Sequence, residues 1–328
     1  DTIHTAIVMT LCLAVVFTFL GIKLIPFALD FMKTPTEVIP ESTKYLTIYF
    51  AGVVGLMIYN IGTGILNAVG DTRRPFFFLV VSAVLNTILD LVFVLVFGMG
   101  VEGVAYATII AQGVSAILIL ITLMRSDTCI KLILRDLRIH FSMLSKIIKV
   151  GIPSAIQMAI TSFSNVFVQS YINVFGANCM SGWTAYSKID QFMMLPMQSL
   201  ALASTTFVGQ NIGAKKYDRV KKGVFAAWLM SSGVILVCSV CMFLSAPFLI
   251  SVFTKDADVI AIGSDMVRIF ASLYIALPVV QILNGALRGA GLSKIPMYFM
   301  LGSFVVLRQI YLMIAVPLTD SVNVVMAG

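Results

Sequence analysis

Long apolar stretches, separated by short polar connections, dominate the chain. A helix needs about 20 mainly apolar residues to cross the hydrocarbon core of a bilayer. Nine stretches reach that length: Ile3–Leu29, Tyr45–Val69, Pro75–Phe97, Glu102–Met124, Ile147–Phe175, Trp183–Phe207, Lys222–Phe253, Ser264–Gly289 and Pro296–Leu318. A tenth helix is expected to begin near Asp320. Because the stretches lack the short alternating pattern of barrel strands, the sequence predicts an all-α polytopic membrane protein.

Charged residues indicate how these helices are oriented. Of the 22 Lys and Arg residues, 15 lie in four alternate connections, at 73–74, 125–149, 215–222 and 288–294. The intervening connections are mainly acidic. By the positive-inside rule the basic connections are cytoplasmic. The net charge of +7 is therefore a signal of topology, and we expect no nucleic-acid partner.

Composition excludes several other classes of protein. The chain is 59% hydrophobic and only 11% charged, whereas soluble domains carry about 25% charged residues. High hydrophobicity also excludes intrinsic disorder. There is no Gly-Lys dipeptide and hence no Walker A loop, and neither His4 nor His140 has metal-ligand neighbours at a suitable spacing. We expect neither an enzyme nor a bound cofactor.

The sequence also matches itself without gaps at an offset of 221 residues. The clearest pairs are spaced Gly and Pro residues: Gly64 with Gly285, Gly70 with Gly291, and Pro75 with Pro296. Six predicted helices separate equivalent positions, so both copies cross the membrane in the same direction. Such a parallel repeat is typical of transporters.

The repeat predicts the organisation of a longer protein. The second copy begins with the helix at Ile147, so two helices of the first copy are expected before residue 1. We expect two six-helix lobes, with an incomplete N-terminal lobe at 1–124 (helices 3–6), a basic cytoplasmic linker at 125–146, and a C-terminal lobe at 147–328 (helices 7–11 and the start of 12).

Acidic residues inside apolar helices are the main candidates for chemistry, because a charge at the bilayer centre is costly and usually functional. Asp90 follows Asn86 by four residues, which places both on one helix face. Thr108 lies on the next helix at a similar predicted depth, about 9–12 Å from the shared end. These three oxygen-bearing side chains are predicted to bind a coupling cation, Na⁺ or H⁺. A structural contact between helices is the alternative.

Asp190 and Arg308 are secondary candidates, since both are charged and fall within predicted spans. Each could be a partner for the other, although the sequence does not establish that pairing. A further set consists of amide, hydroxyl and thioether side chains that share helix faces and could line a substrate cavity: Ser162, Asn165, Gln169, Gln191, Met194, Gln198, Gln281 and Asn284. Amides can equally bond neighbouring helices.

Four short motifs resemble those of the multidrug and toxic compound extrusion (MATE) family. They are Val208–Ala214 (VGQNIGA), Gly151–Pro153 (GIP), Gly70–Pro75 (GDTRRP) and Leu85–Asp90 (LNTILD). The likeness covers essentially the whole chain. It implies a twelve-helix antiporter that exports cationic or amphiphilic compounds against inward flow of Na⁺ or H⁺.

Within the family the chain resembles the DinF-like bacterial branch. That resemblance implies an N-lobe cation site to which Asn86, Asp90 and Thr108 correspond, together with an Asp that would precede residue 1. In the other bacterial branch a Glu on the seventh helix binds the ion, and that position falls at Thr161 here. Because Thr161 replaces that Glu, the resemblance favours the N-lobe site as the place where the ion binds.

The sequence therefore predicts a monomeric, multi-pass protein of the bacterial inner membrane that performs multidrug efflux by cation antiport. Its partners would be the lipid bilayer and a small-molecule substrate. Two other functions are compatible with the sequence. One is a flippase for lipid-linked sugars, whose cavity should be basic, and the other is a membrane module that does not transport.

Overall fold

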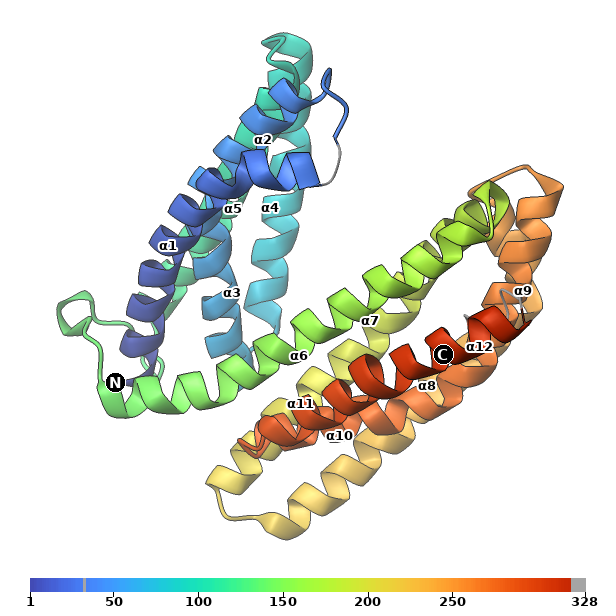
Figure 1. Ribbon diagram of the computed structural model, residues 1–328. Helices are drawn as coiled ribbons and strands as arrows, with labels where there is room; N and C mark the ends of the chain where they lie inside the picture. The colour runs from blue at the N-terminus through green and yellow to red at the C-terminus, as the bar shows by residue number, and fades with distance from the viewer. Residues whose placement is uncertain (32–33, 320–328) are drawn as a thin grey trace. The chain divides into compact units, whose positions relative to one another are not determined.

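The computed structural model describes residues 1–31 and 34–319 (Figure 1). In these residues the chain forms helices and no strand. The chain divides into two compact units, Asp1–Ile147 (unit 1) and Ile148–Gly328 (unit 2). The all-α polytopic architecture predicted from the sequence is confirmed, whereas the tenth helix predicted near Asp320 lies outside the described residues.

Unit 1 contains the helices α1 to α5 and the start of α6. The bounds are α1 Thr2–Phe31, α2 Ile39–Ala51, α3 Val53–Ala68, α4 Arg73–Leu91, a π-helical turn η1 at Val92–Val96, α5 Gly100–Met124 and a 3₁₀ turn η2 at Leu134–Asp136. Helix α5 packs against α2, α3 and α4, and α1 packs against α2 and α3 (Figure 1). The core centres on Ile7, Leu66, Ile119 and Leu123.

Unit 2 contains most of α6 and everything after it. The bounds are α6 Phe141–Val174, α7 Ala177–Gly213, α8 Tyr217–Ser251, α9 Ala257–Leu273, a 3₁₀ turn η3 at Tyr274–Ala276, α10 Leu277–Gly289, α11 Lys294–Met300, a π-helical segment η4 at Leu301–Leu307 and α12 Arg308–Thr319. Helix α7 packs against α8, α9 and α10. Met197, Ile250 and Met266 are among the fully buried side chains of this core.

The predicted spans agree with the structure in number but differ in detail. Eight helices of the described chain are long and apolar enough to cross a membrane, and a ninth arises if α2 and α3, bent by 46°, count as one span. Helix α6 begins six residues before the predicted Ile147, and α7 extends beyond Trp183–Phe207 at both ends. Hydropathy detects only the part of a helix that lies in hydrocarbon, so polar extensions of these helices gave no signal.

Close helix approach in unit 1 depends on small residues. Gly55 on α3 lies against Gly113 on α5, where an added Cβ would be 3.1 Å from the Gly113 backbone nitrogen. Small residues allow this packing in membrane bundles, where the hydrophobic effect does not drive helices together. Across the other side of α5, the Ser82 hydroxyl of α4 donates to the Ala111 carbonyl at 2.8 Å. The Ser82–Ala111 bond fixes the depth of α4 relative to α5.

The predicted linker packs closely on unit 1. Residues 125–140, here called the linker segment, connect α5 to α6, and Ile130 and Leu132 within it are buried in the unit 1 core. These two side chains attach the segment to unit 1, while most of its other residues are exposed.

Candidate functional site

The predicted ion-coupling residues lie on two packed helices of unit 1. Asn86 and Asp90 are on one face of α4 and Thr108 is on α5, and all three are half-buried. Two contacts define the register of these helices, because Ser82 bonds Ala111 and Phe93 lies against Gly103. Between these contacts Thr108 lies at the depth of Asn86, and Asp90 lies about one turn further along α4.

Asn86 and Asp90 on α4 each have a buried polar atom without a hydrogen-bond partner. Asn86 Nδ2 and Asp90 Oδ1 are shielded from solvent and have no hydrogen-bond partner among the described residues. Burying such groups without partners costs several kcal/mol for a charged group and about 1–3 kcal/mol for a neutral one. Thr108 differs, since its hydroxyl donates to the Val104 carbonyl at 2.9 Å within α5. Its oxygen lone pairs remain able to accept or to ligate.

The chemistry of these side chains suits a single small cation. A carboxylate and a hydroxyl supply oxygen ligands, and a half-turn of the Asn86 amide exchanges its nitrogen for its oxygen. Within the described part of the chain no three His, Cys, Asp or Glu residues come together as a metal-binding group. Asp90 is the one acid among the three predicted side chains, and oxygen ligands of this kind suit a hard cation better than a soft transition metal.

A π-helical turn begins two residues after Asp90. Residues 92–96 form η1, and Phe97 N donates to the Val92 carbonyl at 3.1 Å. Such turns interrupt regular helices and are frequent at functional sites. The sequence gives no warning of it, because Val92–Val96 contains neither Gly nor Pro.

In unit 2 the carboxylate of Asp190 is held by two tyrosines. The Tyr274 hydroxyl donates to Asp190 Oδ1, the Tyr186 hydroxyl lies 3.4 Å from the same oxygen, and the two hydroxyls are 2.9 Å apart. The ring of Tyr186 stacks on Phe270 with centroids 4.5 Å apart. Neither tyrosine is among the site residues predicted from the sequence. The spacing of Tyr186 and Asp190, four residues apart on one helix, was the only signal available.

Arg308 has partners other than Asp190. Its Nη1 donates to the Ser164 hydroxyl at 3.1 Å, and its guanidinium lies over the Phe304 ring at 5.4 Å from the centroid. No ion pair joins it to Asp190 within the described structure. The pairing considered from the sequence is therefore replaced by two separate polar clusters.

The predicted cavity residues have very different environments. Ser162, Asn165, Gln191 and Gln198 are exposed, Gln169, Met194 and Gln281 are half-buried, and Asn284 is buried. On α6 the inward stripe is formed by Gln157, Ser164, Val168 and Ile172, about a quarter turn from the predicted amide stripe. A depression of about 460 Å³ lies on α11 and η4 instead, and is lined by Tyr298, Phe299, Gly302, Ser303, Val306 and Leu307. The substrate cavity stays a prediction.

Comparison with known proteins identifies the family. The MatE family model matches residues 1–92 and 153–314, and the probable multidrug resistance protein YpnP of Bacillus subtilis is 31% identical over 93% of this chain and 68% of its own. The chain belongs to the MATE family. A probable multidrug resistance protein NorM of Thermotoga maritima is 28% identical over 80% of this chain and 57% of its own. The chain thus spans 57–68% of the length of these two MATE relatives.

Solved structures of the same fold agree with this assignment. A MOP superfamily transporter from Pyrococcus furiosus superimposes with a TM-score of 0.92 at 23% identity, covering all of this chain and 74% of that one. A multidrug resistance MATE family transporter in an outward-facing conformation gives a TM-score of 0.88 at 23% identity, covering 96% and 71% of the two chains. The fold of this chain is therefore that of MATE transporters.

Proposed function

We propose that the chain forms most of a secondary active multidrug transporter of the bacterial inner membrane. It would export cationic or amphiphilic compounds by antiport against Na⁺ or H⁺, with alternating access of its two lobes. Family membership and the apolar spans of the described helices support this proposal. YpnP and NorM, which share 31% and 28% identity with the chain, are both described as probable multidrug resistance proteins.

The unsatisfied Asp90 carboxylate is the observation that carries the coupling mechanism. Its buried Oδ1 has no hydrogen-bond partner in the described chain, and a buried oxygen without a partner is stabilised when a cation or a proton binds to it. Asn86 and Thr108 supply the neighbouring polar groups. The ion thus stabilises conformations that bury the Asp90 carboxylate. Conformations that expose this carboxylate to water depend less on the ion.

This difference provides the coupling between ion and substrate. A ligand shifts a conformational equilibrium only by its differential affinity for the two states. Each tenfold preference of the ion for one state shifts the populations by about 1.4 kcal/mol. A substrate that prefers the ion-free state would then be exchanged for the ion across the membrane.

Substitution of Asp90→Asn in the complete protein tests the proposal. Asparagine keeps the size of the side chain but can neither ionise nor carry a proton, so ion-driven ethidium efflux from whole cells should fall to the level of cells without the protein. Efflux is measured with the ion gradient intact and after its collapse by an ionophore. Sodium titration at constant pH then distinguishes Na⁺ coupling from H⁺ coupling.

Glu102→Gln provides a matched control in the same unit. Glu102 is on α5, its side chain is 39% exposed, and it pairs with Lys44 at 3.2 Å. Removing an exposed carboxylate of this kind should leave efflux unchanged. Normal efflux by the Asp90→Asn protein, at equal membrane abundance, would exclude Asp90 from coupling.

A further inference from the structure

The linker segment is fixed to one end of unit 1 by specific backbone contacts. The Ile133 backbone N–H donates to His4 Nε2 at 3.1 Å, and the His140 N–H donates to Thr5 Oγ1 at 3.1 Å. Leu132 N also donates to the Leu123 carbonyl at 3.0 Å. These bonds hold the segment where α1 begins and α5 ends. Since both helices are apolar enough to span a bilayer, the segment lies at the level of the membrane–water interface.

The side of the segment that faces away from unit 1 carries basic charge. Residues 125–140 contain four basic and two acidic side chains, and Lys131, Arg135 and Arg138 are all exposed. The one ion pair of Lys131 in the described structure, with Asp127, is 4.0 Å long and the acid is 98% exposed. Such a pair compensates little of the charge.

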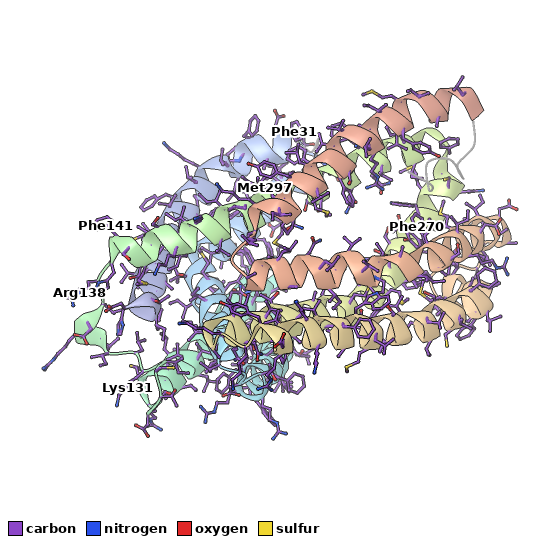
Figure 2. All side chains as sticks on the ribbon, turned by 90° about the horizontal axis from the view of Figure 1, so that it is seen from below. Phe31, Lys131, Arg138, Phe141, Phe270 and Met297 are labelled. Carbon is purple, nitrogen blue, oxygen red and sulfur yellow. The ribbon has the colours of Figure 1, made fainter. Side chains whose placement is uncertain are left out.

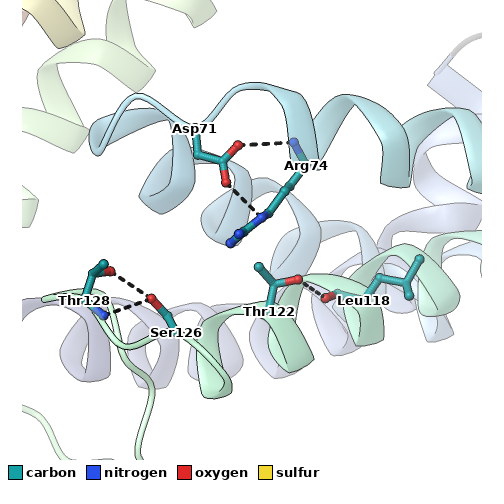
Figure 3. A network of polar contacts seen from close by, with 6 residues as sticks. All are labelled: Asp71, Arg74, Leu118, Thr122, Ser126 and Thr128. Atoms are coloured by element: carbon teal, nitrogen blue, oxygen red, sulfur yellow. Dashed lines mark hydrogen bonds and ion pairs between the residues drawn. The ribbon is translucent and has the colours of Figure 1, made fainter.

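Arg74, at the same end of the unit, has a closer ion pair than the basic residues of the linker segment. It pairs with Asp71 through Nε and Oδ2 at 3.3 Å, and its backbone N–H also contacts the same carboxylate (Figure 3). Figure 3 also shows Ser126 and Thr128, whose hydroxyls are 2.8 Å apart at the start of the linker segment. The carboxylate of Asp71 thus compensates the charge of Arg74, whereas no carboxylate of the described structure pairs with Arg135 or Arg138. Arg138 Nε donates to His140 Nε2 at 3.3 Å.

Large apolar side chains alternate with these basic residues. Leu134 is 61% exposed and Phe141, the first residue of α6, is 80% exposed. Ile133 and Ile139 are exposed as well. Figure 2 marks Lys131, Arg138 and Phe141 at this part of the molecule. Exposed apolar groups interspersed with basic ones are typical of elements that lie in a membrane interface, with the apolar groups inserted and the charges at the headgroups.

We propose that the linker segment, with Phe141, is a binding site for anionic phospholipids. Lys131, Arg135 and Arg138 would bind the phosphate headgroups, while Leu134 and Phe141 would enter the boundary of the acyl chains. Basic clusters next to spanning helices attract anionic lipids in this way. The rigid attachment to α1 reduces the entropy lost on binding, because the backbone is already ordered.

Lipid binding to the complete, detergent-solubilised protein tests the proposal. The protein is titrated with phosphatidylglycerol or with phosphatidylcholine, and bound lipid is counted by native mass spectrometry. The unsubstituted protein should bind phosphatidylglycerol more tightly. Each basic side chain near an anionic surface contributes about fivefold to affinity, so the triple variant K131Q/R135Q/R138Q should bind phosphatidylglycerol about a hundredfold more weakly.

Two further variants separate the parts of the proposal. K215Q/K216Q/K221Q removes the same charge from the connection between α7 and α8 and from the start of α8, and should retain the affinity for phosphatidylglycerol. L134S/F141S should bind both lipids more weakly while keeping the preference for phosphatidylglycerol. Equal thermal unfolding of all variants confirms that they fold.

Equal binding of the two lipids by the unsubstituted protein would overturn the proposal and favour a soluble partner for this surface. An equal loss of affinity for phosphatidylglycerol in K131Q/R135Q/R138Q and in K215Q/K216Q/K221Q would also overturn it. General electrostatic attraction would then be enough to explain the binding. Unchanged binding by L134S/F141S would exclude insertion of the apolar side chains.

Discussion

The partners of single charged residues determine what those residues can do inside a membrane protein. Asp90 and Asp190 both lie on predicted spanning helices, yet the first has an unsatisfied Oδ1 and the second is bonded by Tyr274 and Tyr186. A satisfied carboxylate stabilises helix packing, whereas an unsatisfied one favours ion binding. The sequence identified both acids but could not rank them on this basis, since Tyr274 is 84 residues away from Asp190.

Tyr274→Phe should destabilise unit 2 while keeping the aromatic packing. The change removes the hydroxyl that bonds both Asp190 and Tyr186, and a buried hydrogen bond contributes about 0.5–1.5 kcal/mol. Thermal unfolding in detergent measures the effect. Tyr298→Phe is the control, because Tyr298 is 63% exposed. Equal effects of the two substitutions would contradict a structural role for the Tyr274 hydroxyl.

At the scale of elements, the structure adds contacts and bends to the predicted segments. The linker segment was predicted as a cytoplasmic connection, and the structure packs it on unit 1 through His4 and Thr5. One predicted span became α2 and α3 with a bend at Gly52, and η1 and η4 interrupt two others. Hydropathy reports burial in lipid and contains no information about these local changes of hydrogen bonding.

Thr5→Val should loosen the linker segment without affecting α1. Valine matches the shape of threonine but leaves the His140 N–H without its acceptor, at a cost of about 1 kcal/mol. The population of the open form of the segment should rise roughly fivefold, and the rate of tryptic cleavage after Arg138 should rise with it. In the control Thr10→Val, the lost hydroxyl bonds only Ala6 of the same helix. Identical cleavage rates for the two variants would disprove the role of Thr5.

At the scale of the whole molecule, the internal repeat appears as two turns with the same geometry. Gly70 and Gly291, which are 221 residues apart, have φ angles of 88° and 78°. In each turn the glycine N–H bonds the carbonyl three residues earlier, and the next N–H bonds the carbonyl five residues earlier. This is a Schellman ending of a helix. The helices α4 and α11 then begin at equivalent residues, Arg73 and Lys294.

Alanine at either repeat glycine should destabilise the protein by about 1–2 kcal/mol, because a left-handed backbone conformation is unfavourable for a residue with a Cβ. The effects of Gly70→Ala and Gly291→Ala on thermal unfolding should add in the double variant, since the residues belong to different compact units. Gly233→Ala is the control, as Gly233 is helical and has open space around it in the described structure. A double variant no less stable than either single variant would contradict independent turns.

The sequence by itself determined the class of fold, the approximate positions of the apolar spans, the repeat and the family. The fold class and the spans depend on patterns that the bilayer imposes on the chain, because every apolar span must be long enough to cross it and every backbone group must be bonded within a helix. The repeat and the family depend on spaced Gly and Pro residues and on short motifs. The structure decided which polar atoms find partners. Asp190 with Tyr274, Arg308 with Ser164, and His4 with Ile133 are joined across 84 to 144 residues. Such contacts follow from helix packing, which depends on side-chain shape at each interface and leaves no periodic pattern in the sequence.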